Sequence, residues 1–208
     1  MPLVQHPLVD PPRVATPDDA DRVVEILVGA FHDDPTWSWA FPDPVARPAQ
    51  YRRFWRLFVD GALRYPCVWL TGDASATAVW IPPGGTEMSQ EQEDLVAPLV
   101  VDLLGDRAGP VLQLFEAFDR AHPREEPHYY LTLLGTHPDH WGLGVGLGLL
   151  AATLQEVDRA AMPAYLEASN PVNVDLYARY GFHVHGSFPL PDRSAEVITM
   201  WRPAAEDR

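Results

Sequence analysis

The spacing of apolar residues predicts most of the helices. After a short extended piece, Thr16 is placed as a helix N-cap with Pro17 at the first helical position, and apolar residues then recur every three or four positions. The apolar face so formed contains Ala20, Val23, Val24, Leu27, Val28 and Phe31. The same criteria predict helices over 47–64 and over 88–121, the latter with breaks at Gly105 and at Gly109–Pro110. A further helix runs to about 161 with an inner face of Leu149, Leu150, Leu154 and Val157.

Runs of aliphatic and aromatic residues predict the strands. CVWLTG and ATAVWI are consecutive strands joined by a turn at Gly72 and Asp73, and HVHGSFPLP and SAEVITMW form a final antiparallel pair. HYYLTLLGTHP and AYLEAS flank the helix that ends near 161, and Asn170 and Pro171 then start a short helix that Gly181 ends. One strand–helix–strand unit within a largely antiparallel order predicts an α+β fold, with a mixed, mostly antiparallel central sheet flanked by helices. We find no repeat or linker and expect a single domain over 1–208.

Composition narrows the class of protein. With 208 residues, 47% of them hydrophobic, the chain can bury a core. No apolar run approaches the ~18 residues of a membrane span, and the N-terminus lacks the order of a signal peptide. We therefore expect a soluble, cytoplasmic protein without a membrane partner. The single cysteine, Cys67, cannot form an intrachain disulfide, and the spacing of histidines and acids predicts no metal site.

The negative net charge of the chain favours a cationic small molecule over nucleic acid as a partner. The formal net charge is −14, and all 15 basic residues are arginine. Such a surface repels phosphate backbones, so no nucleic-acid partner is expected, whereas a cationic small molecule such as an amine would be attracted. The alternative is that the acidity serves solubility alone.

Residues 139–148 read DHWGLGVGLG, in which four glycines alternate with apolar residues between a predicted strand and a predicted helix. The first N–H groups of a helix have no intrahelical partners, the helix dipole favours negative charge there, and glycine allows close approach to the main chain. The dinucleotide fingerprint fails because residues 147 and 149 are leucine, and the P-loop fails because there is no lysine. Either another phosphate ligand binds here, or the glycines only permit tight packing of the helix start.

The surrounding residues resemble the GNAT acyltransferase superfamily. Trp141 to Gly146 match its Gln/Arg-x-x-Gly-x-Gly/Ala cofactor motif except at the first position, and Tyr177 stands four residues before Gly181-Phe182, as in the later signature of the family. The layout, with a long helical insert before HYYLTLLG, resembles most the branch that contains puromycin N-acetyltransferase. The resemblance implies a sheet splayed at its central parallel strand pair, a cofactor-binding core over about 128–182 and acceptor-site elements over about 13–125.

The resemblance also implies an activity and a cofactor site. The activity is acetyl-CoA-dependent N-acetyl transfer, by direct attack in a ternary complex, to the amine of a small molecule such as an antibiotic or another specialised metabolite. The implied cofactor contacts are Leu134, Gly135, Thr136, Trp141, Gly142, Leu143, Gly144, Val145, Gly146, Leu147, Asn170 and Asn173. Asn170 also has a sufficient local role as an N-cap. Trp141 replaces the usual Gln/Arg and Leu143 a common Arg/Lys, which would weaken phosphate binding without removing a main-chain donor.

Two residues are implied as catalytic. Tyr177 would be the general acid for the departing thiolate, since a phenol with a pKa near 10 suits that proton transfer. Glu167 would accept the amine proton, directly or through water. The alternatives are a core aromatic for Tyr177, and for Glu167 a strand-end residue that binds the substrate cation or a backbone group. His128, His137 and His140 read as exposed turn residues without a role.

The acceptor site is less well defined by the sequence. FHDDPTWSWAF offers acids for an ammonium group and aromatics for an apolar body, although packing against the sheet explains these aromatics equally well. Phe31, Asp34 and Tyr130 are the candidate substrate contacts. Two rival functions remain: acetylation of a protein N-terminus or peptide, and a non-catalytic acyl-CoA-binding module. The oligomeric state is open, with a homodimer among the alternatives.

Overall fold

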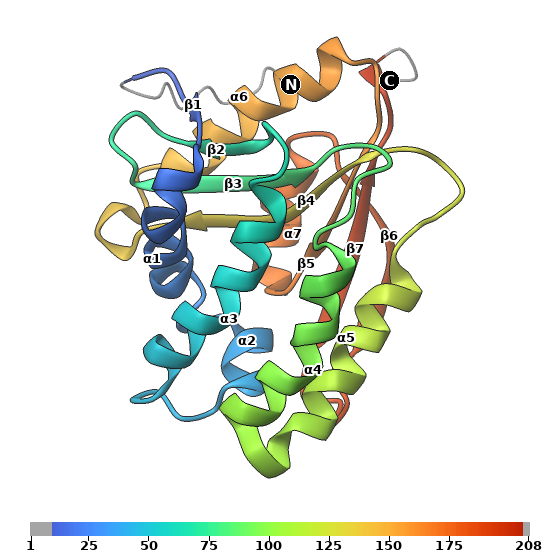
Figure 1. Ribbon diagram of the computed structural model, residues 1–208. Helices are drawn as coiled ribbons and strands as arrows, with labels where there is room; N and C mark the ends of the chain where they lie inside the picture. Colours follow the sequence, from blue (N-terminus) through green and yellow to red (C-terminus); the bar gives the residue numbers. More distant parts are fainter. Residues whose placement is uncertain (1–9, 206–208) are drawn as a thin grey trace.

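A computed structural model describes residues 10–205 (Figure 1). Within this range seven strands form one sheet in the order β1-β2-β3-β4-β5-β7-β6. The strands are β1 (Arg13–Val14), β2 (Val68–Leu70), β3 (Ala76–Ile81), β4 (Tyr129–Thr136), β5 (Ala164–Ala168), β6 (His183–Pro189) and β7 (Glu196–Arg202). Only β4 and β5 pair in parallel among these strands, and all other neighbours are antiparallel, which confirms the predicted α+β class.

The parallel pair opens along its length. Tyr129–Leu131 pair with Ala164–Leu166, whereas β4 continues along β3 as far as Thr136 and β5 continues along β7 as far as Ala168. A bulge lies at the opening, because Val79 pairs with Leu133 and Trp80 with Leu131, so that Thr132 is the extra residue. In Figure 1, β2, β3 and β4 cross the view while β5, β7 and β6 run steeply across them. The sheet is therefore splayed at its central parallel pair.

Helices cover both faces of the sheet (Figure 1). They are α1 (Ala20–Ala30), α2 (Pro35–Ala40), α3 (Arg47–Ala62), α4 (Gln90–Leu104), α5 (Ala108–Ala121), α6 (Val145–Arg159) and α7 (Val174–Ala178). On one face α1 and α3 pack against β3 and β4, and α5 reaches β6; on the other face α6 packs against β2, β3 and β4. No helix within residues 10–205 has the length and apolar character needed to span a membrane.

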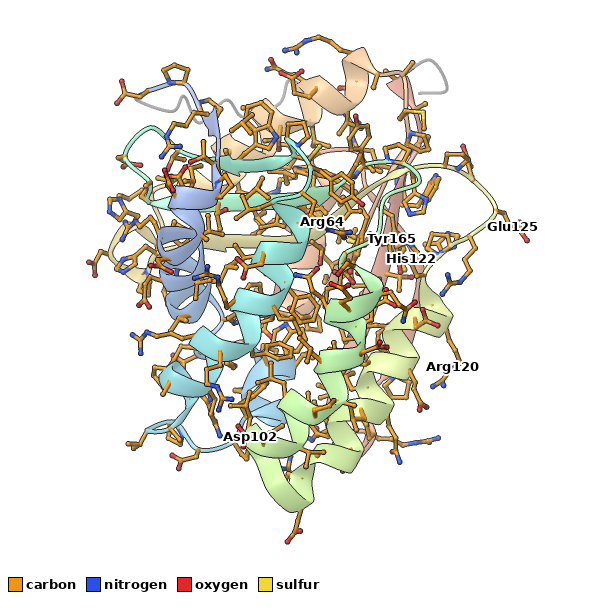
Figure 2. The ribbon with its side chains drawn as sticks, in the orientation of Figure 1. Arg64, Asp102, Arg120, His122, Glu125 and Tyr165 are labelled. Atoms are coloured by element: carbon orange, nitrogen blue, oxygen red, sulfur yellow. The ribbon has the colours of Figure 1, made fainter. Side chains whose placement is uncertain are left out.

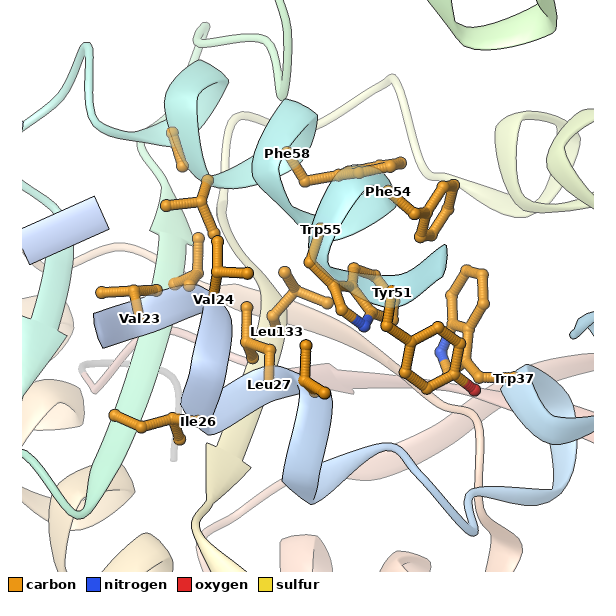
Figure 3. Close-up of a cluster of buried hydrophobic side chains, with 14 of the residues drawn as sticks. Val23, Val24, Ile26, Leu27, Trp37, Tyr51, Phe54, Trp55, Phe58 and Leu133 are labelled. Carbon is orange, nitrogen blue, oxygen red and sulfur yellow. The ribbon is translucent and has the colours of Figure 1, made fainter. Parts of the chain in front are cut away.

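The sheet separates two main cores. The core under α1 and α3 is rich in aromatic rings, which pack edge to face and tilted (Figure 3). Its aromatic members include Trp37, Phe41, Tyr51, Phe54, Trp55 and Phe58. The core under α6 is mainly aliphatic, and the four residues predicted for the inner face of this helix are all buried in it. Each such side chain contributes roughly 1.5–3 kcal/mol on burial.

The structure corrects two of the helix predictions. The break at Gly105 is confirmed by a 3₁₀ turn over Gly105–Arg107, but the break at Gly109–Pro110 is wrong. Pro110 lies in the first turn of α5, where its missing N–H would have no intrahelical partner in any case. Helix α2 was not predicted: Asp34 caps it and Pro35 occupies its first position, so this proline starts a helix.

Two close approaches place the end of α1 against the end of β4. A Cβ atom on Gly135 would lie 3.0 Å from Ala30 Cβ, and one on Gly29 would lie 2.7 Å from Pro138 Cδ. A larger residue at position 135 would crowd α1, and one at position 29 would crowd the Pro138 ring. The segment that follows α1 is thereby held beside the opening between β4 and β5.

Candidate active site

A cleft of about 620 Å³ lies where β4 and β5 part, and we call it the cofactor cleft. Its walls are the ends of α1 and β4, the start of α6 and the segment from Ser169 to Tyr177. The predicted residues that line it are Phe31, Asp34, Leu134, Thr136, Trp141, Gly142, Gly144, Val145, Gly146, Leu147, Asn170, Asn173 and Tyr177. Four predicted residues do not line it: Gly135 faces α1, Leu143 is exposed on the loop, and Glu167 and Tyr130 lie in a neighbouring cluster.

The start of α6 presents main-chain donors to the cofactor cleft. Gly142 and Gly144 have φ angles of +76° and +74°, a region that residues with a side chain rarely adopt. The Gly148 N–H donates to the Gly144 carbonyl, so the N–H groups of the three intervening residues precede the first α-helical bond. A 15-residue helix that begins in this way has the free N–H groups and the dipole direction that suit an anion.

The glycine loop is fixed to the end of β4. A Cβ atom on Gly146 would lie only 2.4 Å from Thr136 Oγ1. The indole Nε1 of Trp141 donates to the Thr136 carbonyl at 2.8 Å, although the Trp141 side chain is half exposed. Trp141, which stands where the resemblance has Gln or Arg, therefore pins the loop to the strand.

The end of β4 offers a strand edge to a ligand. Because the ladder with β5 stops at Leu131, the β5-facing main-chain groups from Thr132 to Thr136 have no partner strand within the described residues. An extended, amide-containing chain can add to such an edge as a further strand. The edge and the α6 terminus together fit a ligand with a diphosphate and an amide-bearing arm, the two features of coenzyme A that proteins recognise through main chain.

Tyr177, on α7, lines the cofactor cleft and is partly buried. Burial, and then the negative charge of Asp34, hold the pKa of its phenol above the usual value. The hydroxyl is protonated at neutral pH, as a free phenol would be, and the raised pKa makes it a weaker acid than a free phenol. Tyr177 is placed to donate a proton to a ligand in the cleft, but the shift lowers its strength as an acid.

Asp34 links two walls of the cofactor cleft. Its carboxylate accepts the N–H groups of Thr36 and Trp37 at 3.0 and 3.1 Å, and the hydroxyl of Ser169 at 2.7 Å. Burial raises the pKa of Asp34. Asp34 is thus the N-cap of α2 and a contact between α2 and the end of β5, and both of its oxygens already have hydrogen-bond partners. Asn170 likewise accepts the Val172 N–H at 3.1 Å, as its N-cap role requires.

A second group of side chains surrounds the point where β4 and β5 part. It consists of Glu87, His122, Tyr130, Tyr165 and Glu167, and we call it the polar cluster. The Glu167 side chain is only 4% exposed and interacts with the hydroxyl groups of Tyr130 and Tyr165. Burial, followed by the charge of Glu167, raises the pKa of both phenols. Figure 2 shows His122 and Tyr165 side by side near the end of α5.

Glu87 is a candidate residue that the sequence did not reveal. It comes from the loop between β3 and α4, and its carboxylate accepts the hydroxyl of Thr132, the bulged residue of β4. Burial raises the pKa of Glu87 to about 7; the Thr132 hydrogen bond opposes this shift and the charge of Glu167 adds to it. The loop passes α3 at Gly61, where an added Cβ atom would meet the Glu87 carbonyl, and Arg64 donates to the Thr86 carbonyl at 2.7 Å. Figure 2 labels Arg64.

The expectation that His128 is exposed is wrong. His128 is 9% exposed, its Nδ1 lies 2.7 Å from the Glu126 carbonyl, and its Nε2 lies 3.2 Å from Nε2 of His122. Burial lowers the pKa of His128. Tyr165 and Trp201, which stand far along the chain from His128, cover the ring. His137 and His140 are partly exposed near the glycine loop.

Comparisons with known proteins agree with this geometry. A family model described as the acetyltransferase (GNAT) family matches residues 31–182, well over half of the chain. The chain therefore belongs to the GNAT acetyltransferase family, and it is a transferase by membership.

Solved structures of GNAT proteins match nearly the whole chain. The histone acetyltransferase HPA2 and related acetyltransferase from Corynebacterium glutamicum is 28% identical, with a TM-score of 0.68, over 94% of this chain and 96% of its own. A mosquito arylalkylamine N-acetyltransferase-like protein (15% identity, TM-score 0.63, 92% and 98% covered) and a Drosophila melanogaster polyamine N-acetyltransferase (12%, 0.62, 91% and 97%) share the fold.

Proposed function

We propose that the protein is an acetyl-CoA-dependent N-acetyltransferase that acts on a small-molecule amine. The observation that carries the proposal is the cofactor cleft, which is lined by the α6 N-terminus, by the end of β4 beyond its pairing with β5, and by the Tyr177 side chain. When bound, acetyl-CoA supplies the acetyl group and a thiolate leaving group. The N–H groups of Val145, Gly146 and Leu147 would hold its diphosphate, and the β4 edge would hold its pantetheine arm.

The proton transfers are assigned to two side chains. The acceptor nitrogen must lose a proton as it forms the amide bond, and Glu167, a shielded carboxylate beside the opening of the sheet, would accept that proton. The departing sulfur must gain a proton, and the Tyr177 hydroxyl would donate it. Direct transfer fits this arrangement because donor and acceptor would meet at the bulge of β4, with no covalent enzyme intermediate required.

The structure also bears on the size of the acceptor. The α4–α5 insert packs beside the sheet, and its end contributes His122 to the polar cluster. Such a wall favours a compact amine over an extended peptide. The polar cluster contains two glutamates and no arginine, so a cationic amine suits it better than an anionic acceptor. Antibiotics and other specialised metabolites belong to this class, in line with the layout that resembles the puromycin N-acetyltransferase branch.

The test is an acceptor screen with acetyl-CoA. Free thiol is measured with alkylamines, arylalkylamines, polyamines and puromycin, and with peptides that carry a free N-terminus; mass spectrometry then identifies the acetylated atom. Amine-dependent thiol release supports the proposal, and turnover of peptides alone supports the rival peptide acetyltransferase. Binding of acetyl-CoA with no turnover of any acceptor contradicts both and favours the acyl-CoA-binding module, which the replacements at Trp141 and Leu143 keep open.

A further inference from the structure

We propose that His122 carries the acceptor proton from Glu167 to solvent, and that His128 fixes the tautomer in which His122 can do so. The inference rests on the proposed function and assigns a positioning pair that the sequence motifs do not contain. It begins from the observation that Glu167, the proposed proton acceptor, has a side chain that is only 4% exposed. A proton taken up there needs a route out.

The balance of the reaction requires that route. An amine binds at neutral pH mainly as an ammonium ion with three protons on a primary nitrogen, and the amide product retains one. Of the two protons lost, one replaces the proton that the Tyr177 hydroxyl donates to the sulfur of coenzyme A, so that the tyrosine is protonated again at the end of the cycle. The other must reach solvent in every turnover, and the carboxylate of Glu167 must be free of it before the next ammonium ion binds.

His122 lies between Glu167 and solvent. It follows the last residue of α5, its Nδ1 is 3.9 Å from Glu167 Oε1, and its side chain is 27% exposed. This separation exceeds a direct hydrogen bond, so proton passage takes a small rotation of the carboxylate or one intervening water. The ring packs against Tyr130 and Tyr165, with centroid distances of 4.8 and 5.0 Å and interplanar angles of 73° and 78°.

The Glu126 carbonyl determines the tautomers of both His128 and His122. The main-chain oxygen of Glu126 only accepts, so Nδ1 of His128, 2.7 Å away, carries the proton. Neutral His128 then presents a lone pair at Nε2, and burial, which lowers the pKa of His128, favours this neutral form. Nε2 of His122, 3.2 Å away, must be the donor in that contact. Neutral His122 therefore presents a lone pair at Nδ1, the atom that faces Glu167.

The proton then passes from the Glu167 carboxyl group to Nδ1 of His122. The Glu167 carboxyl O–H bond breaks and an N–H bond forms at His122 Nδ1, which leaves a carboxylate beside an imidazolium ion; the imidazolium then releases a proton to water. The charged and titratable groups around His122 are Glu167, Glu87, His128 and the phenols of Tyr130 and Tyr165.

The first test reads the tautomers in the unliganded wild-type protein. Two-bond ¹H–¹⁵N NMR spectra distinguish protonated from unprotonated ring nitrogens, and the spectra of His122→Gln and His128→Gln assign the signals. We expect Nε2–H at neutral His122 and Nδ1–H at neutral His128. The opposite tautomer at His122 would overturn the inference, because Nδ1 would then already hold a proton.

The second test uses turnover of an amine found in the acceptor screen. His122→Gln should lower kcat about tenfold or more with little change in the KM of either substrate. Added imidazole should restore part of the loss, because the position is open to solvent. His183→Gln, the same change at an exposed site on β6, is the control. An unchanged kcat, or a loss that imidazole does not restore in a variant with wild-type melting temperature, contradicts the inference.

The two tests separate failure of the inference from failure of the proposed function. If the wild-type protein acetylates no amine, the proposed function fails, whatever the His122 variant does. If the wild-type protein is active and the His122 variant equals it, only the inference fails.

Discussion

The cofactor cleft and the polar cluster are both built around β4 and β5, but from different parts of the polypeptide. The cofactor cleft depends on main chain: two glycines with positive φ, the first N–H groups of α6 and an unpaired strand edge. The polar cluster depends on side chains that lie far apart in the sequence, such as Glu87 and Glu167. The cofactor cleft would bind coenzyme A through main-chain groups, which substitution leaves in place. The polar cluster would bind the acceptor through side chains, which substitution replaces.

The largest expected effect is that of replacing Tyr177, the proposed proton donor of the cofactor cleft. Tyr177→Phe removes the proposed proton donor and should lower kcat by roughly 10²-fold, with the affinity for acetyl-CoA nearly unchanged. Tyr180→Phe, one turn away in the core, is the matched control and should retain kcat. Steady-state kinetics with a titration of coenzyme A separate the two constants. Equal turnover of Tyr177→Phe and wild type would remove the acid role.

A second change tests whether main chain forms the anion site. In Gly146→Ala the new methyl group would meet Thr136 Oγ1, so the Thr136 side chain must rotate, or the helix start or the end of β4 must move. We expect the affinity for coenzyme A to fall about tenfold, equivalent to ~1.4 kcal/mol, as measured by calorimetry. Gly109→Ala, which adds the same methyl group to α5 in open space, is the control and should bind normally. Wild-type affinity in Gly146→Ala would mean that the Thr136 side chain rotates aside without moving the helix start, or that this corner does not hold the ligand.

A third change, Glu87→Gln, tests the polar cluster through the pH dependence of the unfolding free energy. The pKa of Glu87 is raised from its ordinary value near 4.5 to about 7, so its contribution to stability is present below pH 4.5 and is lost as the pH rises through about 7. Glu87→Gln keeps an acceptor for Thr132 and removes the titration. Relative to wild type, the variant should gain about 2 kcal/mol in unfolding free energy between pH 5 and pH 8.

Urea unfolding at several pH values measures this difference. Glu91→Gln, the same substitution at an exposed position of α4, serves as the reference. A difference between wild type and Glu87→Gln that stays constant with pH would show that the Glu87 carboxyl is not shielded in solution.

The smallest expected effect is that of adding a positively charged side chain to the glycine loop at position 143. Leu143 is 65% exposed beside the cofactor cleft, and Leu143→Arg places a positive charge near the α6 terminus. Exposed charge pairs contribute only about 0.5 kcal/mol, so the affinity for coenzyme A should rise roughly twofold, and the gain should fade at high salt. Leu95→Arg on α4 is the charge-matched control. A tenfold gain in the affinity for coenzyme A would contradict the proposal that main-chain N–H groups provide most of the phosphate binding.

The contrast between the two regions also explains what the sequence could predict. The alternating glycines, the N-caps and the apolar face of α6 are local patterns. The family resemblance that the glycines and Tyr177 carry named most of the residues that line the cofactor cleft, and their role in binding a cofactor stays a prediction. Gly135 and Leu143 were exceptions, because only the packed fold shows that one faces α1 and the other faces solvent.

The polar cluster could not be predicted in the same way. Glu87 stands in a loop with the sequence PPGGTEMS, which has no periodicity, and its partner Thr132 faces it only because of the bulge in β4. His128 sits among turn residues, and rings from β5 and β7 bury it. Such contacts depend on strand register over long separations, which one sequence does not encode in any local pattern.

The most direct test of the account is a crystal structure of the protein with bound coenzyme A. We expect the diphosphate on the N–H groups of Val145 to Leu147, the pantetheine arm along the β5-facing edge of β4, and the sulfur within hydrogen-bond reach of the Tyr177 hydroxyl. A diphosphate held by side chains elsewhere, or a sulfur remote from Tyr177, would contradict it.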